Sequence, residues 1–110
     1  MAIDSNMKRG SAEVAILSVL SQEALHGYEI ARRIEERSGG TLRFDLASLY
    51  PLLYRMERDG WLAANWVEAK GRKRRCYELT EKGRGQLAPL RRQWHEFFHA
   101  LNLVAEIDHV

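Results

Sequence analysis

Cysteine, long apolar runs and a secretory leader are scarce or missing in this sequence. Its 110 residues include one cysteine, Cys76, which cannot form a disulfide within the chain and fits a reducing cytoplasm. No run approaches the ~20 apolar residues that cross a membrane. The N-terminal MAIDSNMKRG has no apolar segment of the kind found in a secretory signal. We therefore expect a cytoplasmic protein that does not enter a membrane.

Motifs of catalysis are missing as well. The sequence has no glycine-rich phosphate loop, no nucleophile elbow and no pair of acids placed to flank a cleft. His95 and His99 are four residues apart, a spacing that can bind a metal on a helix. Without a third ligand we prefer a surface pair. Cys76 lies beside Arg75 and could sense oxidants, although a small strand residue is the interpretation we prefer. We predict no enzyme, no cofactor and no metal.

The composition fits one folded domain with a small core. Hydrophobic residues make up 45% of the chain, which is too many for a disordered tail. The formal net charge of +2 is too small to indicate nucleic-acid binding by itself. The run from Lys70 to Arg75 is nevertheless almost entirely basic, while the acids gather elsewhere. The distribution of charge is therefore more informative than its sum.

The segment from Asp45 to Gly60 predicts an amphipathic helix. Its apolar residues recur at spacings of three and four, namely Leu46, Leu49, Leu53 and Met56. Asp45 can cap the N-terminus, and Gly60 stands where a helix usually ends. The opposite face offers hydroxyls, rings and guanidiniums: Ala47, Ser48, Pro51, Tyr54, Arg55 and Arg58, with Tyr50 on its flank. Such a face could enter a DNA major groove and contact phosphates and base edges.

A β-hairpin is expected directly after this helix. Trp61 to Ala69 suits a strand, Lys70 to Arg74 forms a basic tip, and a second strand carries Tyr77 and Leu79 on one face. A helix followed by a hairpin with a cationic tip is the layout of a winged helix-turn-helix, whose wing touches the DNA backbone or minor groove. Either feature alone is usually a solvated surface. A winged helix that binds a protein partner without specific DNA binding stays the alternative.

Two further helices are expected upstream. Residues 1–9 read as a flexible tail, and a first helix from about Ser11 to Ser21 follows, with Ser11 as its cap. The second helix, Gly27 to Arg37, is expected to place Tyr28, Ala31 and Ile34 on its inner side. Thr41 to Phe44 could be a short first strand of the sheet. Residues 10–80 would then form the winged helix-turn-helix domain, and the fold class is α+β, mostly helical.

The C-terminal part, residues 81–110, predicts a dimerisation helix capped by Thr80. Pro89 predicts a kink or restart. Large apolar residues follow a heptad seam, widened by Phe98: Leu87, Leu90, Trp94, Phe97, Leu101 and Val104. Part of this stripe must pack against the first helix of the same chain, but a domain this small cannot cover all of it. We therefore prefer a homodimer, in which two recognition helices read a palindromic site.

Three motifs in order resemble the PadR family of transcriptional regulators. They are the run Leu25-His26-Gly27-Tyr28-Glu29-Ile30, the run Ser48-Leu49-Tyr50-Pro51-Leu52-Leu53, and the run from Arg74 to Gly83. The resemblance extends from Gly10 into the last helix. In length the chain resembles the short subfamily, which has a single C-terminal helix. It implies a winged helix-turn-helix with a helical dimerisation part. Such proteins are mostly bacterial repressors, which phenolic or drug-like effectors release from double-stranded DNA.

The resemblance also implies roles for particular residues. The family's third helix corresponds to the segment with Ser48, Tyr50, Pro51 and Arg55, and Tyr54 lies beside them. The family's wing corresponds to Arg72, Lys73 and Arg74. Tyr28 matches a tyrosine that can lie near phosphate or simply pack. Trp94, with Phe98 nearby, matches a position at the dimer centre, where it could hold a planar aromatic effector or fill the core. The family's usual Pro-Gly-Thr is replaced here by Leu46-Ala47-Ser48, which keeps a hydroxyl but loses the glycine.

Overall fold

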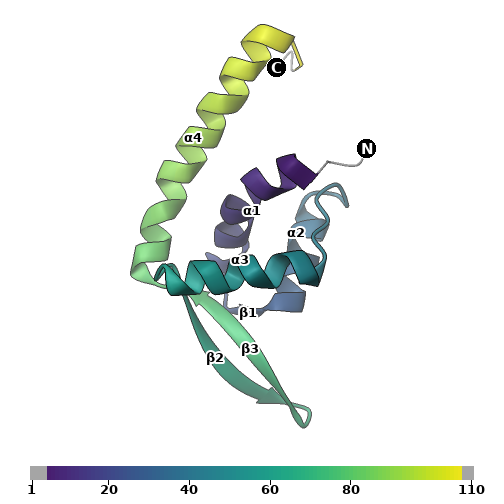
Figure 1. Cartoon of the computed structure of the whole chain (residues 1–110), viewed down its shortest axis with the longest axis vertical. Helices are drawn as coiled ribbons and strands as arrows, with labels where there is room; N and C mark the ends of the chain where they lie inside the picture. Colours follow the sequence, from purple (N-terminus) through teal and green to yellow (C-terminus); the bar gives the residue numbers. More distant parts are fainter. Residues whose placement is uncertain (1–4, 108–110) are drawn as a thin grey trace.

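The computed structural model describes the backbone of residues 5–107 and the side chains of residues 11–107. Four helices and a small sheet follow one another as α1 (Ser5–Leu20), β1 (Leu25–His26), α2 (Gly27–Arg37), α3 (Leu46–Arg58), β2 (Leu62–Ala69), β3 (Arg72–Leu79) and α4 (Glu81–Ala105). The three strands form one antiparallel sheet in the order β1-β3-β2. The β2–β3 hairpin projects from one end of the molecule and α4 from the other (Figure 1). The predicted α+β, mostly helical winged helix-turn-helix is confirmed.

The core lies where the first three helices meet the base of the hairpin. Its fully buried members include Ile16 and Leu17 of α1, Ile30 of α2, Leu53 of α3 and Tyr77 of β3. Burying each such side chain contributes about 1.5–3 kcal/mol relative to leaving it in water. The apolar stripe predicted for α3 is confirmed, since Leu49, Leu53 and Met56 are all buried. The stripe fixes which face of α3 is left to the solvent.

The N-terminal half differs from the prediction at two places. Helix α1 begins at Ser5, six residues before the expected start, so Ser11 is an interior residue and not a cap. Only residues 1–4 of the expected tail lie outside the described residues. A helix can continue beyond its apolar stripe when no breaker stops it, which a search for periodicity does not detect. Tyr28 does not lie on the inner side of α2, because 54% of its side chain is exposed.

The first strand of the sheet is not Thr41–Phe44, which is irregular. It is the two-residue strand β1, in which Leu25 pairs with Tyr77 and His26 with Cys76. Two residues are too few to show a periodic pattern, and they are held in place by a partner about fifty positions away in the chain. The segment after α2 instead turns back, and the amide of Leu42 donates to Ser38 Oγ at 2.9 Å.

The wing turns more tightly than predicted. Ala69 pairs with Arg72, so only Lys70 and Gly71 lie between the strands, with φ values of 52° and 76°. Positive φ at both central residues is the geometry of a type I′ turn, which matches the twist of a hairpin. The expected basic tip, Lys70 to Arg74, therefore shortens to two residues. Arg72, Lys73 and Arg74 belong to β3, where each side chain is exposed.

Helix α4 runs without a break from Glu81 to Ala105, so the restart expected at Pro89 does not occur. Thr80 caps it as predicted, with its hydroxyl accepting the amide of Gly83 at 3.0 Å. A proline inside a helix costs on the order of 3 kcal/mol. Leu87 and Leu90 flank Pro89 and pack against the core, which holds this segment helical. None of the described helices is long and apolar enough to cross a membrane.

Candidate nucleic-acid interface

Helix α3 presents to solvent the polar face that its sequence predicts. Asp45 caps the helix, and its Oδ1 accepts the amide of Ser48 at 2.8 Å. Exposed along this face are Ala47, Ser48, Pro51, Tyr54, Arg55 and Arg58, and Tyr50 is half-buried on its flank. The hydroxyl of Ser48 thus lies in the first turn of α3, where backbone amides also point outward and favour an anion such as phosphate.

Tyr50 connects the two helices of the helix-turn-helix. A Cβ added at Gly27 would approach the Tyr50 ring to 2.7 Å, so the ring packs on the first residue of α2 and needs a glycine there. Tyr50 also stacks on Tyr54, with ring centroids 6.1 Å apart and planes 24° apart. Tyr54 is half exposed and extends this ring surface toward the wing. The Gly27–Tyr50 contact therefore joins α2 to α3.

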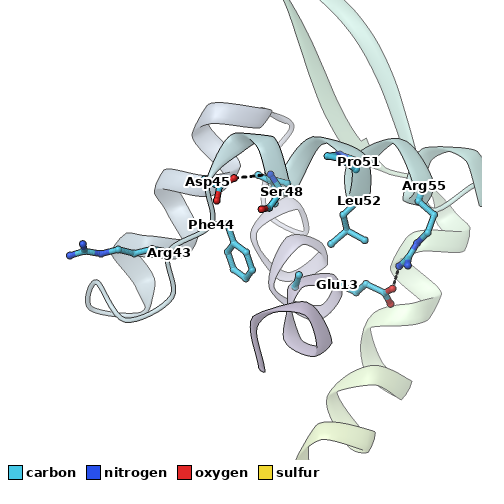
Figure 2. A pocket seen from close by; sticks show the side chains of 10 residues that line it. Glu13, Arg43, Phe44, Asp45, Ser48, Pro51, Leu52 and Arg55 are labelled. Atoms are coloured by element: carbon cyan, nitrogen blue, oxygen red, sulfur yellow. Dashed lines mark hydrogen bonds and ion pairs between the residues drawn. The ribbon is translucent and has the colours of Figure 1, made fainter. Parts of the chain in front are cut away.

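Arg55 does not extend freely from α3, because it forms an ion pair with Glu13 of α1. The pair borders a pocket of about 450 Å³ between α1, the segment Arg43–Asp45 and α3 (Figure 2). Phe44, Leu52 and Pro51 supply its apolar wall. To read a base, Arg55 would have to leave Glu13 or share its guanidinium with it. Sequence reasoning did not detect Glu13, since its partner lies 42 positions away.

The wing is tied to α3 by Arg75, whose role the sequence did not reveal. Its Nη2 lies 2.8 and 2.6 Å from the two carboxylate oxygens of Glu57 on α3. This hydrogen bond raises the pKa of Arg75 above its usual range. The guanidinium also lies 5.8–6.0 Å from three ring centroids, those of Tyr54, Trp66 and Tyr77. Charge-assisted bonds and cation–π contacts are among the stronger polar interactions at a surface, so they orient the hairpin relative to α3.

Tyr77 lies underneath this contact. It is fully buried, and burial raises the pKa of its hydroxyl to about 12. The phenol therefore stays neutral at physiological pH. Its ring centroid lies 6.0 Å from the Arg75 guanidinium, so the ring packs against Arg75 from the core side.

His26 links the start of α2 to the wing. Its Nδ1 accepts the amide of Glu29 at 3.3 Å and so caps α2. Its Nε2 lies 3.0 Å from Nη1 of Arg74. Burial, together with the positive charge of Arg74, lowers the pKa of His26 below 6.5. The imidazole is thus neutral near pH 7, in the form that can accept the cap.

The distal half of α4 carries an exposed apolar surface. Leu87 is buried and Leu90 and Trp94 are partly buried, but the seam residues beyond them are exposed: Phe97, Phe98, Leu101 and Val104. The ring centroid of Trp94 lies 5.6 Å from those of both Phe97 and Phe98.

Among the side chains of residues 11–107, no group of three or more His, Cys, Asp or Glu could hold a metal ion.

This fold and these surfaces define a winged helix-turn-helix of the DNA-binding class. The sequence matches the model of the transcriptional regulator PadR-like family over residues 16–89, and the chain belongs to that family. Its members are DNA-binding transcriptional regulators and not enzymes. The predicted family is therefore confirmed.

Relatives of known sequence and structure agree with this assignment. The chain is 34% identical to the transcriptional regulator Rv3488 of Mycobacterium tuberculosis, over 81% of this chain and 80% of that protein. A PadR-like transcriptional regulator from Bacillus cereus is 28% identical with a TM-score of 0.79, over 94% of this chain and all of that one. A PadR family transcriptional regulator from Eggerthella lenta is 26% identical with a TM-score of 0.80, over 94% and 88%.

Proposed function

We propose that this regulator acts as a homodimer that occupies a palindromic operator and represses the adjacent genes. The observation that carries this proposal is the exposed apolar surface of α4, where Phe97 is 54% and Val104 85% exposed. The distal part of the helix projects away from the winged part (Figure 1), and the described residues leave these side chains exposed. Pairing with the same helix of a second copy would bury both surfaces around a twofold axis.

The DNA contacts follow from the two exposed elements. We place the polar face of α3 in the major groove, with Ser48, Tyr50, Pro51, Tyr54 and Arg55 toward bases and backbone. The exposed cations of β3, namely Arg72, Lys73 and Arg74, would lie against the flanking phosphates. Tyr28 stands exposed at the start of α2, where its hydroxyl would reach a phosphate. A dimer would then read half-sites about one or two helical turns apart.

An effector would act through the dimer centre. Trp94, Phe97 and Phe98 form a cluster of rings on α4, and a second copy would bring the same cluster to the axis. We propose that a planar aromatic or phenolic compound binds against Trp94 and Phe98 and changes the angle between the subunits. The test is titration with a broad panel of flat aromatic compounds. The absence of any change in tryptophan emission or DNA affinity, relative to Trp94→Ala, would reject the effector site.

The dimer is tested by placing a carboxylate on either face of α4. Leu101→Glu should give a monomer in sedimentation and lower the affinity for an operator at least tenfold, because each half-site then binds alone. His99→Glu introduces the same group on the opposite face and should change neither property. Equal behaviour of the two variants would contradict dimerisation through this surface.

Operator recognition is tested with the DNA upstream of the protein's own gene against a shuffled duplex at two salt concentrations. Tight, sequence-dependent binding by two chains per site is the expected result. Weak binding that is equal on both duplexes and abolished by modest salt would favour the alternative, a winged helix that contacts a protein partner.

A further inference from the structure

A groove of about 600 Å³ separates α3 from the inner face of the hairpin, and we call it the wing groove. Four aromatic side chains line it, namely Tyr28, Tyr50, Tyr54 and Trp66, and the consecutive cations Arg72 to Arg75 of β3 line it as well. Aromatic and cationic groups therefore line the same groove.

The rings of the wing groove are unusually exposed for their size. Trp66 is 66% exposed, and Tyr28 and Tyr54 are 54% and 50% exposed. Trp66 pairs with Arg75 across the hairpin, on the face that carries Leu62 and Ala64 toward the core. It therefore lies on the side of the wing that faces α3, beyond the point where the core ends. Large apolar rings gathered in this way on a surface usually mark a binding site.

The charges of the wing groove favour an anion. Glu29 is the one acidic side chain among the described residues that line it, and Arg32 lies 3.4 Å from its carboxylate. Arg75 is already neutralised by Glu57. Within residues 11–107, Arg72 and Lys73 form no ion pair, which leaves their charges available to phosphate. The groove thus combines ring faces with uncompensated cations.

A DNA duplex could engage the cations of the wing groove but not the faces of its aromatic rings. Double-stranded DNA offers phosphates and base edges, whereas the faces of its bases are covered by the neighbouring bases in the stack. Aromatic side chains contribute most when they stack on unpaired bases, with cations following the backbone. We propose that the wing groove binds single-stranded nucleic acid, with Trp66 stacking on an unpaired base and Arg72 and Lys73 contacting its phosphates.

The test compares a labelled single-stranded 12-mer with an operator duplex, using the full chain, by fluorescence anisotropy at one salt concentration. Trp66→Ala should weaken binding to the single strand by roughly tenfold or more, since losing one base–aromatic stack has an effect of that size. Duplex binding should fall by a smaller factor, about threefold or less, because Arg75 loses its contact with Trp66 but keeps Glu57, Tyr54 and Tyr77 to hold the wing. Trp66→Phe should retain much of the single-strand affinity. Val67→Ala, an exposed neighbour on the other face of β2, should match the parent chain.

Three outcomes would overturn the proposal. The first is an absence of single-strand binding under conditions where the duplex binds. The second is a parallel loss on both ligands in Trp66→Ala, which would mean that Trp66 only shields the Arg75–Glu57 contact. The third is competition by adenosine monophosphate as effective as that by the 12-mer, which would assign the groove to a free nucleotide. Because the duplex is measured in parallel, failure here is distinct from failure of operator binding.

Discussion

The contact between α4 and the base of the wing can be tested with two glycines two positions apart. A Cβ at Gly83 would lie 2.1 Å from the carbonyl oxygen of Trp61, whereas a Cβ at Gly85 would meet nothing within 4 Å. Carbon essentially never approaches closer than 3.0 Å in such a contact, so Gly83→Ala requires a movement of about 0.9 Å. The Trp61 oxygen cannot yield easily, because it accepts the amide and the hydroxyl of Thr80 at 3.1 and 3.2 Å.

The two substitutions should therefore have opposite effects. Overpacking costs up to about 3 kcal/mol, and replacing glycine by alanine in a helix gains about 1 kcal/mol. Gly83→Ala should thus lose roughly 2 kcal/mol of unfolding free energy, and Gly85→Ala should gain about 1 kcal/mol. With a shift of roughly 4 °C per kcal/mol for a chain of this size, Tm should fall by about 8 °C in the first variant and rise by about 4 °C in the second.

The assay is thermal unfolding followed by circular dichroism at equal protein concentration, since Tm depends on concentration in an oligomer. A Gly83→Ala protein as stable as the parent would show that the first turn of α4 does not rest on Trp61. The same Tm change in both variants would leave helix propensity as the only effect. Because this contact sets the angle between α4 and the wing, Gly83→Ala should also weaken operator binding.

Three further predictions concern the groups that set the local geometry. The pKa of His26 is lowered in the folded chain, so the unfolded chain binds more protons at mildly acidic pH. Its contribution to stability should be complete above pH 6.5 and lost as pH falls through the lowered pKa. In His26→Gln the urea midpoint should depend less on pH between 7 and 5, and an identical dependence would contradict this. Asp45→Ala should cost about 1 kcal/mol of unfolding free energy in urea by removing the cap of α3. Asp45→Asn should retain most of this stability; equal losses would assign the effect to the carboxylate charge and not to the capping bond. Glu57→Gln should lower duplex affinity by loosening the wing while leaving the slope against salt unchanged, because no phosphate-contacting cation is removed; a steeper slope in a salt titration would instead show that the freed Arg75 binds a phosphate.

Much of the fold could be predicted because its information is local. The spacing of Leu49, Leu53 and Met56 determines which face of α3 is buried. The opposite face, with Ser48 and Pro51, is therefore the one exposed to solvent. Asp45 and Thr80 cap their helices through contacts to residues three positions ahead. These relations involve neighbours in the chain, so the sequence alone indicates them.

The candidate site was predictable in its elements but not in its contacts. The exposed residues of α3 are where the pattern placed them, whereas Arg72, Lys73 and Arg74 lie in β3 and not in the turn that the pattern predicted. The two-residue strand β1, the Arg55–Glu13 pair and the Arg75–Glu57 pair were not foreseen. Each joins side chains or strands that are far apart in sequence and carries no periodic signal.

The sequence by itself determined the order of the four helices and the hairpin, the polarity of their faces and the family, because these depend on spacing and on local backbone chemistry. Only the tertiary structure decided how α3 and the wing are oriented toward one another and which cations are already paired. Those properties depend on distances between Glu57, Arg75 and Trp66, which exist only after the chain has folded around Tyr77.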